Sequence, residues 1–270
     1  MTVAIAIKTM GGSVIATDRQ QTEGELKVNW GKMAVNWRAE RGSLVVSGAG
    51  NAAYLDVVSD CLRDWFNDDP AVPLTATGLE PGLQKRHEDF YQRYVMPFEG
   101  YQEYERPDYE LLIVGSPVNS EARIWTTHKL VMQRHHEDFA AVGCGGTVAR
   151  ALLDKFHIPG LPLDAAINLA ALVLWEVKQS VDGVGLETDL MEIRRDHLPK
   201  MIPREQVNLM EAQFRSYRKL EAGTLYYCLG GDLTDAQKQM WEQFEDDDET
   251  RKKSIRQFFE KLNDERAKPK

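Results

Sequence analysis

Short apolar runs between glycine turns fill the first 48 residues of the chain. Runs of this kind, rich in Val and Ile and bounded by Gly, are typical of β-strands. The predicted strands are Val3–Ile7, Ser13–Thr17, Lys32–Trp37 and Ser43–Ser47. The pair Gly11-Gly12 joins the first two strands, so the chain is predicted to open on a hairpin that begins directly after Thr2.

After residue 48, apolar residues recur at the spacing of an α-helix. Apolar side chains at 54, 58, 61, 62 and 65 share one helical face and predict a helix over Ala52–Phe66, whereas the three prolines in 67–82 predict a loop. Further helices are predicted over Leu83–Val95, Thr147–Phe156 and Pro162–Gln179, and further strands over Tyr109–Val114, Ala122–Thr127, Phe139–Val142 and Thr188–Ile193. This order predicts an α+β fold in which two mostly antiparallel sheets are stacked with helices outside, in four layers.

The last quarter of the chain has a different pattern. Arg204–Arg218 is predicted to be helical, Thr234 and Gln237 have the spacing of a capping box, and apolar residues at 255, 258, 259 and 262 predict an amphipathic helix. The sequence therefore predicts two parts, a domain over 1–202 and a helical C-terminal extension over 203–270.

Composition and charge narrow the class of protein. A hydrophobic content of 43% with 28% charged residues is typical of a globular chain, and the net charge of −9 argues against nucleic acid as a partner. Three scattered cysteines without a CxxC motif favour a reducing, cytoplasmic environment. No signal peptide and no membrane span are predicted. Adjacent His135 and His136 point to opposite faces of a strand, so no metal site is expected there.

The second residue has the chemistry of a nucleophile. Methionine aminopeptidase removes Met1 when a small residue such as Thr2 follows it. The Thr2 hydroxyl would then lie beside a free α-amine whose ordinary pKa is about 7.7–8.0. Nucleophile and general base would thus belong to one residue.

Three other residues lie on predicted strand ends near Thr2. Asp18 ends the hairpin strand, Lys32 opens the third strand, and Gly48 follows the fourth. A cation near the amine lowers its pKa, a carboxylate holds the cation, and a backbone N–H stabilises an oxyanion. Lys32 would be the cation, Asp18 the carboxylate and Gly48 the source of the N–H group.

The order of these motifs resembles the proteasome β-type N-terminal-nucleophile (Ntn) hydrolases. That family includes the 20S proteasome β subunits, the peptidase of the bacterial two-component ATP-dependent protease and the bacterial ancestral β subunits. Asp18 lies sixteen residues after Thr2, and the stretches "DRQQTEG" (18–24), "GKMAV" (31–35) and "LVVSGAGNAA" (44–53) resemble three family segments. The later stretches "AAVGCGG" (140–146) and "VDGVGLETDL" (181–190) resemble two conserved turns of the family, so the resemblance covers roughly residues 2–195.

The resemblance also implies roles for further residues. Substrate-binding positions fall on Gln21, Thr22, Val46 and Ala49. Asp182 falls in the family's Asp- and Ser-bearing turn, where the expected Ser is not clearly present. Gly143 and Cys144 fall in the other turn, where Cys144 replaces the Ser that orients the base, although a thiol is a weak hydrogen-bond donor.

Together these observations predict a threonine peptidase that hydrolyses peptide bonds through Thr2, needs no cofactor or metal, and is located in the cytoplasm. The resemblance implies a homo-oligomeric ring or helical assembly that accepts peptides or unfolded proteins, with an ATP-dependent unfoldase as a further partner. Two alternatives remain open. One is an Ntn amidohydrolase acting on a small amide, and the other is a non-catalytic assembly subunit of the same fold.

Overall fold

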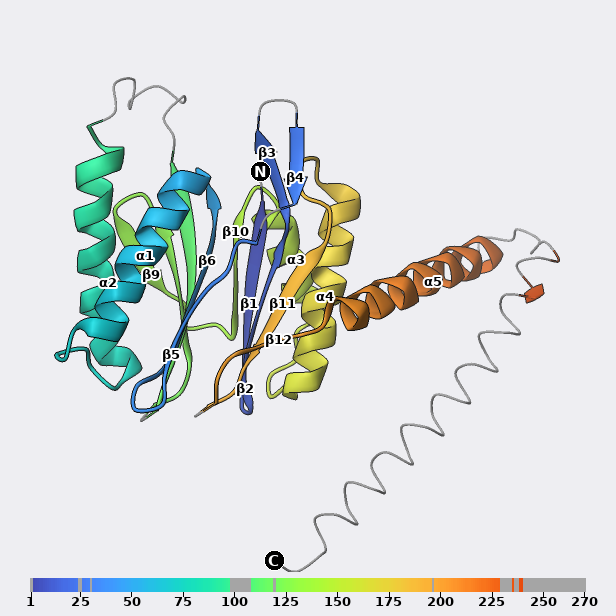
Figure 1. The fold of residues 1–270 in the computed structure, drawn as a ribbon. Coiled ribbons are helices and arrows are strands. Elements are labelled where there is room, and N and C mark those ends of the chain that lie inside the picture. The colour runs from blue at the N-terminus through green and yellow to red at the C-terminus, as the bar shows by residue number, and fades with distance from the viewer. Residues whose placement is uncertain are drawn as a thin grey trace, which may run out of the picture. The chain divides into compact units, whose positions relative to one another are not determined.

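The computed structural model describes residues 2–23, 26–29, 31–97, 108–118, 120–195 and 197–228, together with 235, 238 and 239. The chain divides into two compact units, residues 1–211 and 212–270. The first unit is an α+β structure with two antiparallel sheets (Figure 1). The predicted capping box at 234–237 and the predicted amphipathic helix around 255–262 lie largely or wholly outside the described residues.

The first sheet has the strand order β10-β1-β2-β11-β12. Its strands are β1 (Val3–Thr9), β2 (Gly12–Asp18), β10 (Phe139–Gly143), β11 (Thr188–Ile193) and β12 (Lys200–Met201). The predicted opening hairpin is confirmed, with β1 and β2 paired from Ala4↔Thr17 to Thr9↔Gly12. The apolar residues of these two strands are buried on both faces, which explains why they form continuous runs rather than an alternating pattern.

The second sheet has the order β5-β6-β7-β8-β9, and a separate two-stranded ribbon pairs β3 with β4. The strands are β3 (Gln20–Glu23), β4 (Leu26–Asn29), β5 (Ala34–Arg38), β6 (Gly42–Gly50), β7 (Tyr109–Pro117), β8 (Arg123–His128) and β9 (Val131–Arg134). The ribbon, β9 and β12 were not predicted. These strands have only two to four residues each, too few to carry a repeating apolar pattern.

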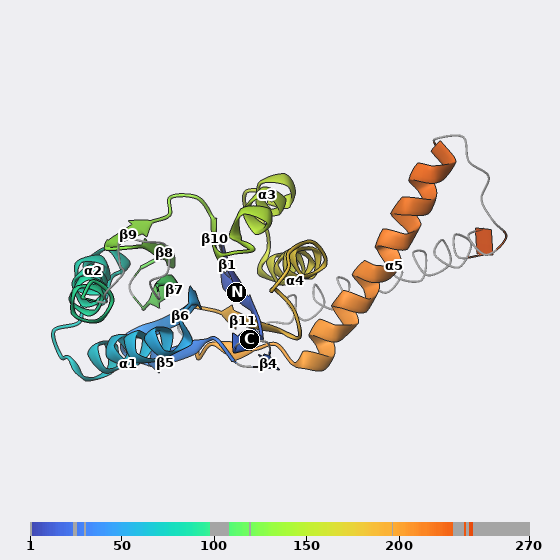
Figure 2. The same cartoon turned by 90° about the horizontal axis from the view of Figure 1, so that it is seen from above.

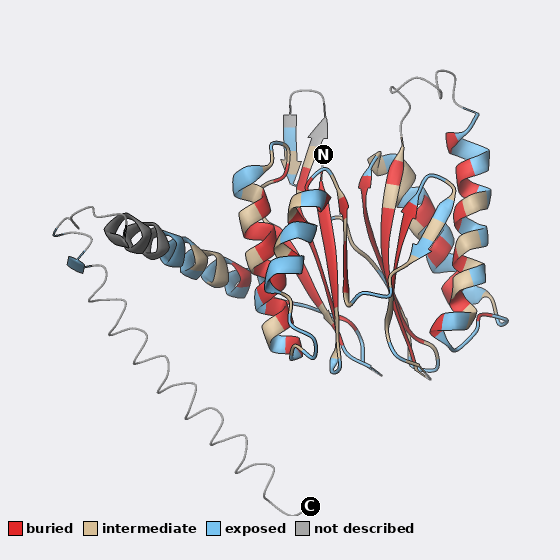
Figure 3. Cartoon of the chain, turned by 180° about the vertical axis from the view of Figure 1, so that it is seen from behind, coloured by how far each residue is buried: buried red, intermediate tan, exposed pale blue. Residues whose placement is uncertain are grey.

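Five α-helices occur in the described residues. They are α1 (Ala52–Asp68), α2 (Ala76–Phe90), α3 (Gly146–Phe156), α4 (Leu163–Ser180) and α5 (Arg204–Cys228), and a π-helical turn, η1 (Tyr91–Val95), continues α2. Viewed from above, α1 and α2 lie outside the second sheet, whereas α3 and α4 lie outside the first (Figure 2). Their buried sides face the strands (Figure 3).

The start of α2 corrects a sequence prediction. Residues 67–82 were expected to be a loop because of their prolines, but α2 begins at Ala76 and contains Pro81. The Thr75 side chain caps the helix by accepting a hydrogen bond from Gly78 N at 3.2 Å. Burial of Leu79 and Leu83 then outweighs the backbone hydrogen bond that Pro81 cannot make.

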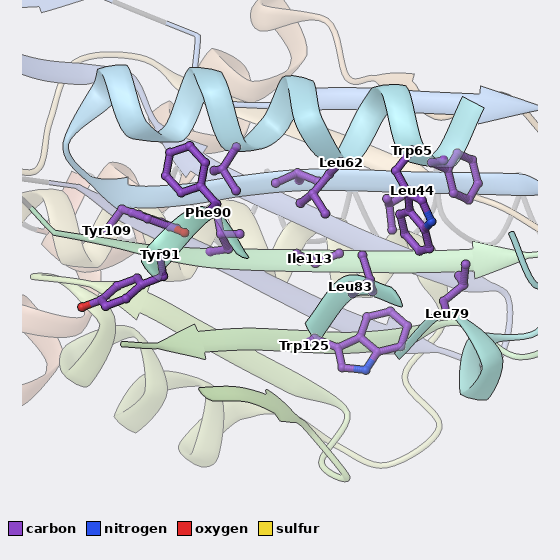
Figure 4. Close-up of a cluster of buried hydrophobic side chains, with 14 of the residues drawn as sticks. Leu44, Leu62, Trp65, Leu79, Leu83, Phe90, Tyr91, Tyr109, Ile113 and Trp125 are labelled. Carbon is purple, nitrogen blue, oxygen red and sulfur yellow. The ribbon is translucent and has the colours of Figure 1, made fainter. Parts of the chain in front are cut away.

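Two apolar clusters stabilise the first unit. One joins α1 and α2 to the second sheet and contains large aromatic side chains such as Trp65, Tyr109 and Trp125 (Figure 4). The other lies between the two sheets and is built from smaller residues, including Ala4 and Ala140 from the first sheet and Val45 from the second. Small side chains allow the two sheets to approach closely, and this fixes the ends of β1, β2 and β6 relative to one another.

Within the described residues, none of the helices combines the length and apolar content needed to cross a bilayer.

Candidate active site

Thr2 lies directly before β1, the strand between β10 and β2 in the first sheet. It is only 5% exposed, yet it lines a cavity of about 700 Å³. The buried strand that follows therefore holds Thr2 at the edge of an open space. A nucleophile needs this combination of fixed position and access.

Asp18 ends β2 and is completely buried. Its Oδ1 accepts hydrogen bonds from Val3 N at 3.0 Å and from Lys32 Nζ at 3.1 Å. Its Oδ2 accepts from the backbone N–H groups of Gln20 and Gly185, at 3.1 and 3.2 Å. Four donors, one of them cationic, satisfy the buried carboxylate, which would otherwise be costly to remove from water.

Lys32 connects Asp18 with Thr2. Its ammonium donates to Thr2 Oγ1, to Asp18 Oδ1 and to the Gln20 carbonyl oxygen at 2.6 Å, so all three of its donors are used. Its side chain is 9% exposed. Burial lowers the pKa of Lys32 below its usual range, and the attraction of Asp18 only partly opposes this shift.

Lys32 does not open a strand as predicted. The strand β5 begins at Ala34, and Lys32 lies in the segment between β4 and β5. Its three hydrogen bonds turn the side chain toward Thr2, and these contacts are with residues 2, 18 and 20 rather than with a neighbouring strand. Tertiary contacts, not strand pairing, therefore set its position.

Gly48 presents its backbone to the cavity. The pairing of β5 with β6 begins at Ala34↔Val46, so β6 has no β5 partner from Ser47 onward. Leu111, opposite Gly48, donates its N–H away from β6 to Thr127 Oγ1 at 2.8 Å. Two residues directly opposite each other in antiparallel strands either exchange backbone hydrogen bonds or both point their N–H groups away from each other. The Gly48 N–H therefore points away from β7, toward the edge of β6 that β5 leaves unpaired.

Only glycine fits at position 48. A Cβ there would lie 2.4 Å from the Glu110 carbonyl oxygen and 2.6 Å from Leu55 Cδ2. The residue thus combines close packing against β7 and α1 with an outward-facing N–H group in the lining of the cavity.

Gly143 and Cys144 lie against the backbone of Thr2. Gly143 has a φ of +90°, and a Cβ on it would come within 2.2 Å of the Thr2 carbonyl oxygen. The Cys144 thiol is exposed and donates to that same oxygen at 3.4 Å. The turn therefore positions the main chain of Thr2.

The turn after α4 reaches the site through its backbone. Gly185 N–H binds Asp18, whereas the Asp182 side chain is exposed and forms no hydrogen bond or ion pair with the described residues. A Cβ on Gly185 would lie 2.6 Å from Gln20 Oε1. The Gln20 side chain therefore fills the space into which a side chain at position 185 would extend.

The predicted substrate-binding residues have different locations. Gln21 lines the cavity, and Thr22 lies in β3, paired with Lys27, with its side chain outside the described part. Val46 belongs to the buried cluster beneath α1 and α2. Ala49 is 6% exposed and lies close to Gly143. Neither of these two contributes to the lining of the cavity.

Sequence reasoning missed three residues around the site. Gln20 supplies both a backbone donor to Asp18 and the carbonyl that holds Lys32. Arg19 forms an ion pair with Asp189 of β11 at 2.7 Å, and both side chains are largely buried. The charge of Arg19 next to Asp18 was a visible signal, but its partner lies 170 residues away in sequence.

A metal site is not found in the part of the chain that the structure describes, where no three His, Cys, Asp or Glu side chains are grouped to hold an ion. The convergence of a hydroxyl, an ammonium, a carboxylate and a free strand edge is instead an arrangement suited to acyl transfer.

Comparison with known proteins identifies the fold. No protein-family model and no curated protein matches the sequence. Among solved structures, Anbu (ancestral beta-subunit) from Yersinia bercovieri superimposes with a TM-score of 0.65 at 18% identity, covering 79% of this chain and 93% of that one. The Anbu complex from Pseudomonas aeruginosa, solved as a helical assembly, gives 0.68 at 18% identity, covering 87% and 99%.

A Gly-1 mutant of Anbu from Hyphomicrobium sp. strain MC1 gives a TM-score of 0.68 at 14% identity, covering 87% of this chain and 99% of that one. These solved structures are Anbu (ancestral beta-subunit) proteins, and the likeness to them shows the fold of this chain. The fold-level resemblance seen in the sequence is confirmed over most of the chain.

Proposed function

We propose that this protein is a threonine-type peptidase whose nucleophile is Thr2, exposed as the N-terminus by removal of Met1. The observation that carries the proposal is the set of contacts made by Lys32, whose ammonium bonds both the Thr2 hydroxyl and the buried Asp18 carboxylate. The first unit would then be the four-layer αββα Ntn-hydrolase sandwich, with the hydrolase domain over 1–202 and the helical extension over 203–270.

The reaction begins with proton transfer. The Thr2 α-amine takes the proton of the Thr2 hydroxyl, directly or through a water, while the Lys32 charge lowers the pKa of that amine. Asp18 holds Lys32 in place. Thr2 Oγ1 then attacks the carbonyl carbon of the scissile bond, and the negative charge that develops on the carbonyl oxygen is stabilised by the Gly48 N–H.

The C–N bond breaks when the protonated amine gives its proton to the leaving nitrogen. This leaves an ester between the acyl part of the substrate and Thr2. A water then gives a proton to the amine and attacks the ester carbonyl carbon. The bond from that carbon to Thr2 Oγ1 breaks, the amine returns the proton to Oγ1, and the carboxylic acid product is released. In this proposal Cys144 holds the main chain of Thr2, and Asp182 belongs to the turn whose Gly185 N–H holds Asp18. Gln21 and Thr22 contact the substrate, whereas Val46 and Ala49 act through the packing behind the cavity lining.

We further propose that the protein forms a homo-oligomeric ring or helical assembly in the cytoplasm. The helical assembly of Anbu from Pseudomonas aeruginosa supports this part of the proposal. Peptides or unfolded proteins are the proposed substrates, and an ATP-dependent unfoldase is the proposed partner that delivers them.

Replacement of the nucleophile tests the proposal. Thr2→Ala should lower kcat/KM on fluorogenic peptides by at least about 1,000-fold, because removing a covalent nucleophile leaves only binding and oxyanion stabilisation. Thr2→Ser retains a hydroxyl and should keep measurable activity. Undiminished hydrolysis by Thr2→Ala would refute the proposal, and Thr2-dependent turnover of small amides alone would point to the amidohydrolase alternative.

A further inference from the structure

The cavity beside Thr2 has a second wall that the proposed chemistry does not use. The helix α1 contributes Asp56, Ser59 and Asp60 to the lining. Residues spaced three and four apart lie on one face of a helix, so these polar groups are turned together toward the cavity. The cavity therefore extends from the nucleophile to an acidic helix face.

Negative charge is in excess on the α1 wall of the cavity. Asp60 forms an exposed ion pair with Arg63 at 2.7 Å. Asp56 forms no hydrogen bond or ion pair with the described residues and is exposed. Of the described residues that line the cavity, Lys32 is the one cation, and its three donors are already occupied. The α1 wall therefore presents a carboxylate that lacks a counter-charge.

A buried hydroxyl near the nucleophile points independently to a bound group. Ser47 lines the cavity and is 3% exposed, and its Oγ has no hydrogen-bond partner among the described residues. A buried polar atom without a partner costs free energy, so such atoms are normally satisfied by protein, water or ligand. Ser47 lies on the part of β6 that β5 leaves uncovered.

We propose that this cavity selects a substrate with a lysine or arginine side chain on the amino side of the scissile bond. This inference rests on the proposed peptidase function and names its substrate class. The cationic end is held by Asp56, with Asp60 adding to the negative field, and the polar backbone of the substrate satisfies Ser47.

The size and the remaining lining fit such a side chain. A volume of about 700 Å³ is within the range of ligand-binding pockets, roughly 300–1,000 Å³. Met33, Ala34 and Leu55 supply apolar surface along the cavity. The methylene stem of a long basic side chain packs on surface of this kind while its charged end remains near water.

A panel of fluorogenic peptides that differ only in the residue before the cleaved bond tests the inference. Lysine and norleucine have side chains of similar length and differ in charge. Wild type should cleave the lysine peptide with a kcat/KM at least about threefold higher than the norleucine peptide, as expected for a partly exposed ion pair. A glutamate peptide should be the poorest substrate, and added salt should reduce the ratio.

In Asp56→Asn the ratio of lysine to norleucine should fall to about one. Asp68→Asn is the matched control, because Asp68 is an exposed carboxylate of α1 that does not line the cavity and pairs with Arg38 rather than with the partner of Asp60. It should leave the ratio unchanged. An Asp56→Asn protein that keeps the wild-type ratio, or a wild type that prefers norleucine or glutamate, would overturn the inference.

Binding to the full-length Thr2→Ala protein separates this inference from the proposed function. The lysine peptide, carrying a fluorescein label, should bind at least about threefold more tightly than the norleucine peptide in fluorescence anisotropy. If wild type cleaves no peptide, the proposed function fails, but the affinity ratio still decides the inference. Equal affinity for the two peptides would refute it.

Discussion

Two buried polar clusters, one at each sheet, differ in charge. At the end of the first sheet, Lys32 and Asp18 form a buried ion pair that contacts Thr2. In the core against the second sheet, His87 bonds the Tyr109 hydroxyl at 3.0 Å and the Lys129 carbonyl at 2.6 Å. Both clusters are shielded from water, but only the first lines the cavity.

This difference indicates which cluster is built for chemistry. A buried ion pair gives little net stability, because the cost of desolvating the two charges offsets their attraction. Beside a nucleophile, however, its charges shift the pKa values of the groups that exchange protons. A neutral histidine bonded to a tyrosine and a carbonyl satisfies polar groups within an apolar core. We therefore expect changes at the first cluster to alter activity most, and changes at the second to alter stability alone.

The largest effect is expected from Lys32→Met. The variant removes the cation beside Thr2 and should lower kcat/KM on peptides by at least about 100-fold, the range lost with acid-base groups. It also leaves the Asp18 carboxylate buried without its counter-charge, so the free energy of unfolding should fall by about 3–5 kcal/mol. Kinetics and chemical denaturation measure the two effects.

Lys8→Met is the matched control for this variant. Lys8 lies at the opposite part of β1 and pairs with Asp138 at 3.0 Å, with both side chains partly exposed. Its replacement should change unfolding by no more than about 1 kcal/mol and leave peptide hydrolysis intact. Equal losses in the two lysine variants would contradict the special role of Lys32.

A smaller and purely structural effect is expected from Tyr109→Phe. The variant leaves the buried His87 Nδ1 without its partner, and this should lower the free energy of unfolding by about 1–3 kcal/mol. Activity should stay unchanged. Tyr54→Phe, which loses an exposed hydrogen bond to the Tyr94 carbonyl, should cost less. A large loss of activity in Tyr109→Phe would break the distinction between the clusters.

The smallest effect is a pH dependence of stability. Burial lowers the pKa of His87 below its ordinary value of 6.5. Below pH 6.5 the unfolded chain therefore binds a proton that the folded chain resists, and stability falls as pH falls. At pH 5.5 the loss should be at most about 1.4 kcal/mol per such group. His87→Phe should show a weaker decline, and an identical decline in both proteins would argue against this assignment.

The sequence predicts best the elements that carry a repeating apolar pattern. The strands β1 and β2 and the helix α4 have long apolar runs, and each was predicted within a few residues. The ribbon β3–β4 was missed because Gln20–Glu23 is polar throughout. The start of α2 was missed because burial outweighed the local signal of Pro81.

The candidate site likewise contains residues that the sequence predicts and contacts that it does not. Thr2, Asp18 and Lys32 were predicted from their order along the chain, and the structure brings their side chains together. Contacts made by the main chain, such as Gly185 N–H to Asp18, have no side-chain signature in the sequence. The ion pair between Arg19 and Asp189 depends on the pairing of β2 with β11, which a single sequence does not reveal.

The proposed mechanism requires Thr2 to be a free N-terminus, and the intact mass of the full-length protein purified from cells measures this directly. We expect a mass short of one methionine residue, with Thr2 identified as the first residue by N-terminal peptide sequencing. A protein that retains Met1 would have no free amine at Thr2, and this result would contradict the proposed mechanism.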